Sequence, residues 1–418
     1  MDKIFAWLDR NLIPFMTRLS EQRHLRAVRD GIISTIPLII VGSFFLIIAF
    51  PPVPALAALV KPYAAQILLP FRLTMGLMAL YAAHSIGYHL AKSYKLDGVA
   101  GGTLALAAFL LTSLPVAIEG KGLALLMENL GGGGMFVAII MAIVAVEILR
   151  FAKEKKITIR MPEGVPDSVA RSFEALVPAG IIIPVVWAVR HLAGFDIQHA
   201  VAQLFAPLVT AGNTLAGVLV PIILISLLWA TGIHGDSVVG TVARPVWLVL
   251  LDQNIAAAAA GQPIPNIAPE PFFQWFVFIG GSGATIGLVC LMMLSKSAYL
   301  RGVGKAAFLP GVCNINEPVI FGAPIMLNPL LVVPFVAGPV LMGVVTWFAM
   351  SFGLVTKPYI LVPWTLPAPI GAYLATGGDW RAIVLAMFNI AVATVLYYPF
   401  LKAYERKLLK ESDQEDSQ

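Results

Sequence analysis

The chain alternates long apolar runs with short polar segments that carry most of its charge. A helix that crosses the roughly 30 Å hydrocarbon core of a bilayer needs about 20 apolar residues. Ten runs approach that length: Gly31–Phe50, Ile67–Leu90, Gly98–Ala117, Gly131–Leu149, Ala175–Val189, Ala211–Ile233, Val242–Ala260, Phe272–Leu294, Leu330–Phe352 and Ile383–Leu401. The pattern therefore predicts an all-α integral membrane protein with about ten transmembrane helices.

Two further apolar stretches, Ala306–Leu327 and Tyr359–Ala375, are interrupted by Pro, Gly and Asn residues. Irregular backbone at membrane depth is tolerated only where protein buries it or where it lines a wet cavity. Interrupted segments of this kind are the usual sequence pointer to the binding site of a transporter. We expect both stretches to be re-entrant hairpins or broken helices.

The distribution of Lys and Arg tests the number of spans, because these residues gather in cytoplasmic loops. Ten spans that start from an inner N-terminus place 21 basic residues in inner segments and 5 in outer segments. We therefore expect both termini in the cytoplasm. The weakest spans are the fifth, which is short, and the seventh, which contains Arg244 and Asp252.

The composition agrees with a lipid-embedded chain. Hydrophobic residues make up 59% of it and charged residues 12%, whereas soluble domains carry about 25% charged residues. The net charge of +5 is spread along the sequence, so we expect membrane lipid and no nucleic acid as partner. Cys290 and Cys313 form no CxxC pair, and no Walker, haem or metal-ligand spacing occurs. We expect no metal, no cofactor and no ATP-driven pump.

The chain divides into two unequal halves. Residues 1–212 hold five predicted spans and a long basic inner loop, and helical spacing in Met1–Asp30 indicates an amphipathic helix on the inner surface. Residues 213–402 hold five spans, both interrupted stretches and most polar residues at membrane depth. We interpret these as a scaffold half and a substrate half, followed by a polar cytoplasmic tail at 403–418.

Ionisable groups inside a membrane are costly and usually functional. The strongest candidates are Glu317 and the three carboxamides around it, Asn314, Asn316 and Asn328, in a run that three prolines break. Carboxylates and amides suit a polyhydroxylated ligand, because together they donate to and accept from its hydroxyl groups. The alternative is that Glu317 caps a half-helix, and both roles can hold together.

Two other segments carry candidate ligands. Gly232 and Gly235 permit an unwound turn that places His234 and Asp236 near membrane depth. Both residues can bind a ligand. The alternatives are that His234 is a structural histidine and that Asp236 caps the following helix. Trp364 lies between prolines in the second interrupted stretch, where its indole face can pack on a pyranose ring; the alternative is a tryptophan of the interfacial belt.

Several short motifs along the chain point to one known protein family. They are Arg29–Gly31, Pro37–Gly42, Tyr94–Asp97, Met161–Pro166, Ser172–Phe173, Leu176–Pro178, Gly232–Gly235 and the run from Asn316-Glu317-Pro318 to Asn328-Pro329. With them, essentially the whole chain resembles the membrane-embedded IIC component of the bacterial sugar phosphotransferase system, in the lactose/cellobiose (diacetylchitobiose) family.

The resemblance implies a homodimer in the bacterial inner membrane, with the first five spans at the dimer interface. The later spans and two hairpins would hold the sugar, and the second half would move against the first to expose the site alternately to each side. The resemblance also implies that the sugar is phosphorylated as it reaches the cytoplasmic face. The donor would be a phosphocysteine on a separate IIB protein, charged by IIA.

The resemblance assigns the family's key glutamate and histidine to Glu317 and His234, the preceding asparagine to Asn316 and, more loosely, a ring-stacking tryptophan to Trp364. Glu317 and His234 would bind the hydroxyl to be phosphorylated, and either could act as its base. No fused phosphorylatable domain is seen in the sequence, so we expect the chain to bind and move sugar without catalysing transfer alone.

The rival function is a proton-coupled secondary sugar transporter in which Glu317, His234 and Asp236 form a proton relay. A purely structural membrane protein leaves the cost of burying Glu317 unexplained. Cellobiose, diacetylchitobiose, lactose and aryl-β-glucosides all remain open as substrates.

Overall fold

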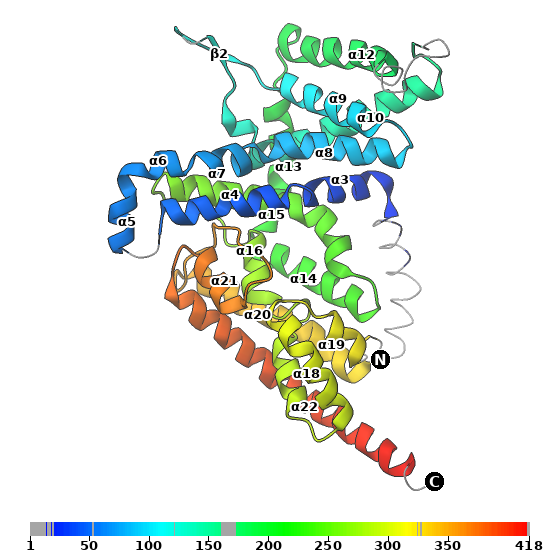
Figure 1. Ribbon diagram of the computed structural model, residues 1–418, viewed down its shortest axis with the longest axis vertical. Coiled ribbons are helices and arrows are strands. Elements are labelled where there is room, and N and C mark those ends of the chain that lie inside the picture. Colours follow the sequence, from blue (N-terminus) through cyan, green and yellow to red (C-terminus); the bar gives the residue numbers. More distant parts are fainter. Residues whose placement is uncertain are drawn as a thin grey trace. The chain divides into compact units, whose positions relative to one another are not determined.

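The computed structural model describes residues 14, 18, 21–51, 54–120, 122–159, 173–323, 325–326 and 328–415 (Figure 1). These residues are mostly helical, as the sequence predicts. Their one sheet is an antiparallel hairpin of β1 (Val116–Ile118) and β2 (Gly122–Ala124). Two parts of the sequence prediction lie outside the described residues. They are most of the predicted surface helix Met1–Asp30 and the motif Met161–Pro166 with Ser172.

Long apolar helices are fewer than the sequence indicates. Within the described residues five are long and apolar enough to cross a membrane, namely Arg23–Ala49, Ala58–Ser93, Gly132–Glu154, Leu330–Ser351 and Trp380–Lys410. A sixth is counted if Leu176–Leu192 and Ile197–Gly212, bent by 86° at their junction, form one span. Two further apolar helices have only 14 and 16 residues, about 21 and 24 Å at 1.5 Å per residue. The count of about ten spans is not confirmed.

The predicted eighth span, Phe272–Leu294, is not continuous. Helix α16 (Glu270–Phe272) runs into a π-helical turn, η7 (Phe273–Val277), and helix α17 begins only at Ile286. Between them Gly280, Gly281 and Gly283 have φ angles of 79°, 95° and 86°. This left-handed backbone, which glycine adopts without steric penalty, ends the helix.

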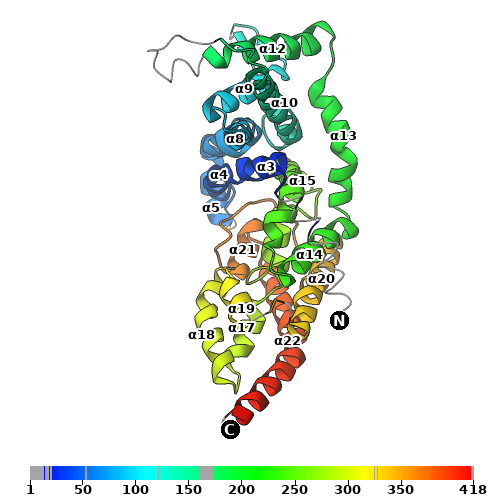
Figure 2. The same ribbon diagram turned by 90° about the vertical axis from the view of Figure 1, so that its right-hand side faces the viewer.

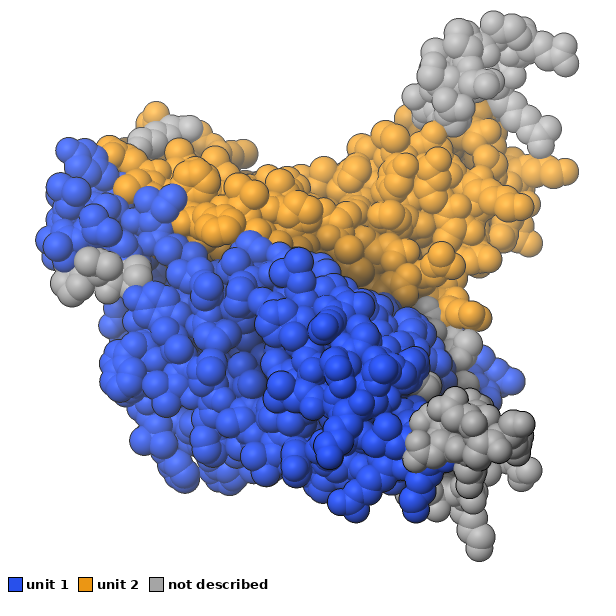
Figure 3. Space-filling model, turned by 60° about the horizontal axis from the view of Figure 1, so that its bottom comes forward, with its two compact units in different colours: residues 1–19, 47–64, 210–418 blue, residues 20–46, 65–209 orange. Residues whose placement is uncertain are grey.

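The chain forms two compact units, coloured separately in Figure 3. Unit 1 comprises residues 1–19, 47–64 and 210–418, and unit 2 comprises residues 20–46 and 65–209. The scaffold and substrate roles expected for the two halves of the chain remain predictions.

Unit 2 is built around α8 (Met78–Ser93), which lies between α3 (Arg23–Ile33) and α9 (Gly98–Leu111) and also packs on α10 (Met135–Glu154) (Figure 1). A Cβ atom on Gly87 of α8 would lie 2.6 Å from the carbonyl oxygen of Gly101 on α9. Glycine therefore lets the two backbones touch, as small residues do in membrane helix pairs.

The other elements up to residue 212 are shorter or bent. They are α4 (Ile36–Ala49), α5 (Pro54–Val60), η2 (Lys61–Tyr63), α6 (Ala64–Ile67), α7 (Leu69–Thr74), η3 (Met75–Leu77), η4 (Met127–Asn129), η5 (Gly132–Gly134), α12 (Leu176–Trp187), η6 (Ala188–Leu192) and α13 (Ile197–Gly212).

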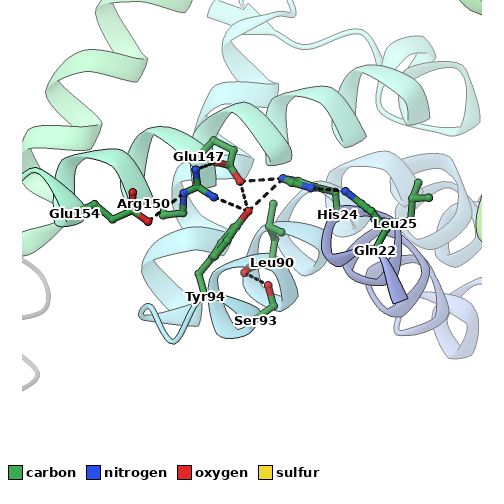
Figure 4. Close-up of polar contacts among 9 residues, drawn as sticks. All are labelled: Gln22, His24, Leu25, Leu90, Ser93, Tyr94, Glu147, Arg150 and Glu154. Carbon is green, nitrogen blue, oxygen red and sulfur yellow. Dashed lines mark hydrogen bonds and ion pairs between the residues drawn. The ribbon is translucent and has the colours of Figure 1, made fainter. Parts of the chain in front are cut away.

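A polar cluster ties three helices of unit 2 together (Figure 4). The Tyr94 hydroxyl donates to Oε1 of Glu147 at 2.5 Å, and Nε2 of His24 lies 2.9 Å from the same oxygen. Arg150 donates to the Tyr94 oxygen at 2.9 Å and pairs with Glu147 at 3.1 Å. Burial, followed by the hydrogen bond to Glu147, raises the pKa of Tyr94, so its hydroxyl stays a donor.

Unit 1 contains the remaining helices. In chain order they are α14 (Leu215–Ala230), α15 (Gly235–Ala259), α16, η7, α17 (Ile286–Met293), α18 (Ala298–Val312), α19 (Glu317–Gly322), α20 (Pro329–Ser351), α21 (Ala368–Ala375) and α22 (Trp380–Glu415). Helix α20 lies beside α14 and α22 (Figure 2).

Both stretches that the sequence marks as interrupted are interrupted in the structure. Helices α18 and α19 are separated at Cys313–Asn316, and a second break separates α19 from α20. In the other stretch a segment without regular secondary structure precedes α21, and the backbone N–H groups of Tyr359 and Ile360 donate to the Ala375 carbonyl at 2.9 and 3.1 Å. These two hydrogen bonds close the stretch into a hairpin.

Candidate functional site

The turn between α14 and α15 presents His234. Gly232, with φ of 90°, lets the chain leave α14, and His234 is the N-cap residue of α15. Its Nδ1 accepts a hydrogen bond from the Ser237 backbone N–H at 3.2 Å and lies 3.0 Å from the Ser237 hydroxyl. A backbone N–H only donates, so Nδ1 is the acceptor and the neutral ring carries its proton on Nε2. The exposed imidazole therefore offers an N–H donor.

A tryptophan that the sequence reasoning did not single out lies against this histidine. The Trp229 and His234 ring centroids are 4.4 Å apart with the planes tilted by 45°. Trp229 is only 4% exposed, and its Nε1 donates to Oδ2 of Asp236 at 3.0 Å. The sequence feature that could have identified Trp229 is its position five residues before His234, at the end of an apolar run. The capping alternative raised for Asp236 is therefore wrong: His234 is the N-cap of α15, and Asp236 lies in its first turn.

The carboxamide of Asn314 is engaged with backbone on both sides. This residue has φ of 61°, and its Oδ1 accepts from the Gly280 N–H at 2.9 Å. Its Nδ2 donates to the carbonyl oxygens of Trp364 and Leu366 at 2.8 and 3.0 Å. Asn314 therefore connects the break after α18 to the glycine-rich turn and to the Trp364 segment.

The neighbouring Asn316 is also held by backbone. It is 4% exposed, and its Nδ2 donates to the Ser282 carbonyl at 2.6 Å. A Cβ atom on Gly281 would lie 2.4 Å from Cγ of Asn316. Only glycine fits at position 281, and the contact fixes the residue that immediately precedes Glu317.

Glu317 opens α19 and is half-buried. Across the part of the chain that the structure describes, no hydrogen bond or ion pair reaches its carboxylate. The capping alternative raised for Glu317 thus has no hydrogen bond to support it. A half-buried carboxylate without a protein partner is available to a ligand.

The second break in the same run returns to the histidine turn. Asn328 caps α20, since its Oδ1 accepts from the Leu330 N–H at 3.1 Å. Met326 lies two residues before Asn328 in the sequence. A Cβ atom added to Gly232 would lie 2.5 Å from the methyl carbon of Met326. The break between α19 and α20 therefore packs directly on the turn that presents His234.

Trp364 contributes an accessible ring. The residue is 49% exposed, while its carbonyl oxygen is held by Asn314. Its indole is thus supported through the backbone and remains open on its surface. The ring-stacking role stays a prediction.

All the candidate residues belong to unit 1, and among them Asn314 and Trp364 are in direct contact. The available chemistry is an imidazole N–H donor at His234, a free carboxylate at Glu317 and an exposed indole at Trp364. Asn314, Asn316 and Asn328 are occupied with backbone, and Asp236 with Trp229 and the Ser282 hydroxyl. Among the described residues no group of three or more His, Cys, Asp or Glu side chains could hold a metal ion. The set suits a neutral, hydroxyl-rich ligand with an apolar face.

Comparisons with known proteins point the same way. Residues 29–339 match the family model described as "Phosphotransferase system, EIIC". The chain is 40% identical to the lichenan permease IIC component of Bacillus subtilis (strain 168), over 99% of this chain and 96% of that protein. It is 39% identical to the cellobiose-specific EIIC component of Geobacillus stearothermophilus, over 97% of this chain and 95% of that protein.

A solved structure is similar as well. It is the crystal structure of the transporter ChbC, the IIC component from the N,N'-diacetylchitobiose-specific phosphotransferase system. The TM-score is 0.92 at 40% sequence identity, and the match covers 97% of this chain and 99% of that chain.

Proposed function

The chain belongs to the EIIC family of the phosphotransferase system, and on that premise we propose that it binds a β-linked disaccharide and carries it into the cell. This membership confirms the resemblance seen in its motifs. The observation that carries the proposal is the unpaired Glu317 carboxylate in the same unit as the free imidazole N–H of His234. Both lie at breaks in apolar helices, where a transporter binds its substrate.

The substrate we propose is of the cellobiose or diacetylchitobiose type. Similar proteins are named for lichenan, cellobiose and diacetylchitobiose. The exposed indole of Trp364 offers a flat apolar surface for one pyranose ring, and Glu317 and His234 offer one acceptor and one donor for hydroxyl groups.

The hydrogen bonds of His234 support different tasks for the two candidate bases. Because Nδ1 of His234 accepts from Ser237, its Nε2–H can donate to a sugar hydroxyl but cannot take a proton from it. Glu317 is then the group that accepts the proton when the hydroxyl oxygen attacks phosphorus and the donor's sulfur–phosphorus bond breaks. Phosphoryl transfer depends mainly on positioning, so a weak base is sufficient.

The wider assembly follows from the same proposal. The sugar would be phosphorylated by a separate IIB protein that IIA recharges, and the chain would work as a homodimer in the bacterial inner membrane. Both termini would be cytoplasmic, as the excess of inner Lys and Arg favours. All site residues belong to unit 1, and movement of the later half of the chain would expose them alternately to each side.

The proton-coupled alternative has less support. A relay through Asp236 needs this carboxylate and His234 to exchange protons. In the structure Nδ1 of His234 is paired with Ser237, and Oδ2 of Asp236 accepts from Trp229.

The test is binding of a panel of β-linked disaccharides to the detergent-purified protein. We expect one or more of them to bind the wild type and to be lost in Glu317→Gln, which removes the acceptor charge at nearly constant volume. Glu119→Gln, on the exposed hairpin turn, is the matched control and should bind normally. Failure of a folded wild-type protein to bind any of them, or normal binding by Glu317→Gln, would contradict the proposal.

A further inference from the structure

Asp236 joins three elements of unit 1 through a single oxygen atom. It lies in the first turn of α15. Its Oδ2 accepts from Nε1 of Trp229, at the end of α14, at 3.0 Å. The same Oδ2 accepts from the hydroxyl of Ser282, in the glycine-rich turn that follows η7. The sequence predicts that Asp236 is a ligand, a helix cap or a proton carrier, and none of these roles explains two protein donors on one oxygen.

We propose that Asp236 is a positioning residue that orients both sugar-binding groups, His234 and Glu317, without contacting the sugar. The inference rests on the proposed sugar-binding function. It differs from the sequence-based assignments in what it requires of the side chain, namely an acceptor oxygen at the place of Oδ2.

The effect on His234 passes through Trp229. Because its Nε1–H is bound by Asp236, the buried indole cannot rotate about its side-chain bonds without losing that hydrogen bond. The centroids of the indole and imidazole rings are 4.4 Å apart, and the Ser237 backbone N–H holds Nδ1. The direction of the His234 Nε2–H is thereby fixed.

The effect on Glu317 passes through Ser282. The Ser282 side chain is bound to Asp236, and its carbonyl oxygen accepts from Nδ2 of Asn316 at 2.6 Å. Asn316 precedes Glu317 directly and packs without spare room on Gly281. A shift of the Ser282 turn would therefore move the residue that starts α19.

The arrangement distinguishes an acceptor from a charge. Both donors reach the same carboxylate oxygen, and a carboxamide oxygen can also accept two hydrogen bonds. Asp236→Asn should thus preserve the two contacts, whereas Asp236→Ala removes both. If Asp236 instead bound the sugar through its second carboxylate oxygen, or carried a proton, that role would be lost in both variants.

The experiment measures the dissociation constant of the disaccharide that binds best, using purified full-length protein. We expect Asp236→Asn to bind within about threefold of wild type and Asp236→Ala to bind at least about tenfold more weakly. Trp229→Phe keeps the aromatic contact but removes the N–H donor. Added to Asp236→Ala, it should weaken sugar binding less than it does when added to the wild type. Elution of each variant as a single species in size-exclusion chromatography verifies that it is folded.

Equal loss in Asp236→Asn and Asp236→Ala, or wild-type affinity in Asp236→Ala, would overturn the positioning role. If Asp236→Ala does not fold, Trp229→Phe and Ser282→Ala replace it, each expected to weaken binding by about threefold or more; wild-type affinity in both would overturn the role. Absence of binding in the wild type itself would reject the proposed function, and is thus distinguishable from failure of the positioning role alone.

Discussion

The side-chain amide of Asn314 donates a hydrogen bond to the carbonyl oxygen of Trp364 at 2.8 Å. The indole that we propose as a sugar-stacking surface is thus held in place through its own backbone, by a residue 50 positions earlier in the sequence. Because Asn314 also accepts from Gly280, its carboxamide sets the spacing between the Trp364 segment and the glycine-rich turn.

Asn314→Asp tests this connection. Aspartate tolerates the left-handed backbone at position 314 and keeps the acceptor for Gly280, but it has no N–H for the Trp364 and Leu366 carbonyls. We expect disaccharide binding to weaken by about tenfold. Trp364→Phe keeps a stacking ring and should lose less affinity than Trp364→Ala, measured by the same titration. Unchanged affinity in Asn314→Asp would show that the Trp364 segment is placed by other contacts.

His234 carries two separable functions, a helix cap at Nδ1 and a free donor at Nε2. Asparagine at this position keeps a capping oxygen but lacks the distal N–H. We expect His234→Asn to retain its thermal unfolding temperature and lose sugar binding, whereas His234→Ala also loses about 1 kcal/mol of stability with the cap. Thermal unfolding and sugar titration on the same samples separate the two effects. Sugar binding by His234→Asn at wild-type strength would rule out the Nε2 donor.

Gly232 is restricted by conformation and by contact. Its φ is 90°, and an added Cβ would lie 2.5 Å from the Met326 methyl carbon. We expect Gly232→Ala to lower stability by about 1–3 kcal/mol. Adding Met326→Ala relieves the clash but not the left-handed strain, so thermal unfolding of the double variant should recover only part of the loss. Full recovery would mean that the backbone conformation at position 232 costs nothing.

Asp379 gives a pH dependence whose sign can be derived. Burial acts to raise the pKa of its carboxyl group, but hydrogen bonds from Arg381 and from the Thr356 backbone outweigh it and lower the pKa to about 2. A carboxyl group with a depressed folded-state pKa stabilises the fold above its ordinary pKa, and this stabilisation is lost as the pH falls toward 2. Asp379 is 8% exposed and Arg381 46% exposed, so solvent screening reduces the effect.

We therefore expect Asp379→Asn to lower stability by up to about 2 kcal/mol at neutral pH. The difference from wild type should be constant above about pH 5 and shrink below pH 4. Thermal unfolding in detergent between pH 3 and pH 7 measures it. A difference that does not change over this range would show that the carboxylate charge has no part in the contact.

The sequence predicts the parts of the structure that depend on local chemistry. Apolar runs give the helical class, and Pro, Gly and Asn residues locate the breaks around Asn314 and Trp364. The break at Gly280–Gly283 was missed, because glycine is common inside membrane helices and only the backbone φ angles reveal the turn.

The candidate site was predicted less completely, for a physical reason. Residue types show which groups can bind a hydroxyl, but not which are already occupied. Asn314 and Asn316 are engaged with backbone partners 30 or more positions away in sequence, and Trp229 reaches His234 only once the turn at Gly232 has formed. Such pairings depend on the tertiary fold and leave no local pattern.

The contact between Gly87 and Gly101 in unit 2 has a consequence for how that unit tolerates change. Helices in lipid gain little by excluding water, so the fit of α8 to α9 holds them together. A soluble core fails mainly when side-chain volume is removed. Here the backbones already touch, so adding a single methyl group at either glycine separates the helices, while trimming large side chains that face lipid changes little.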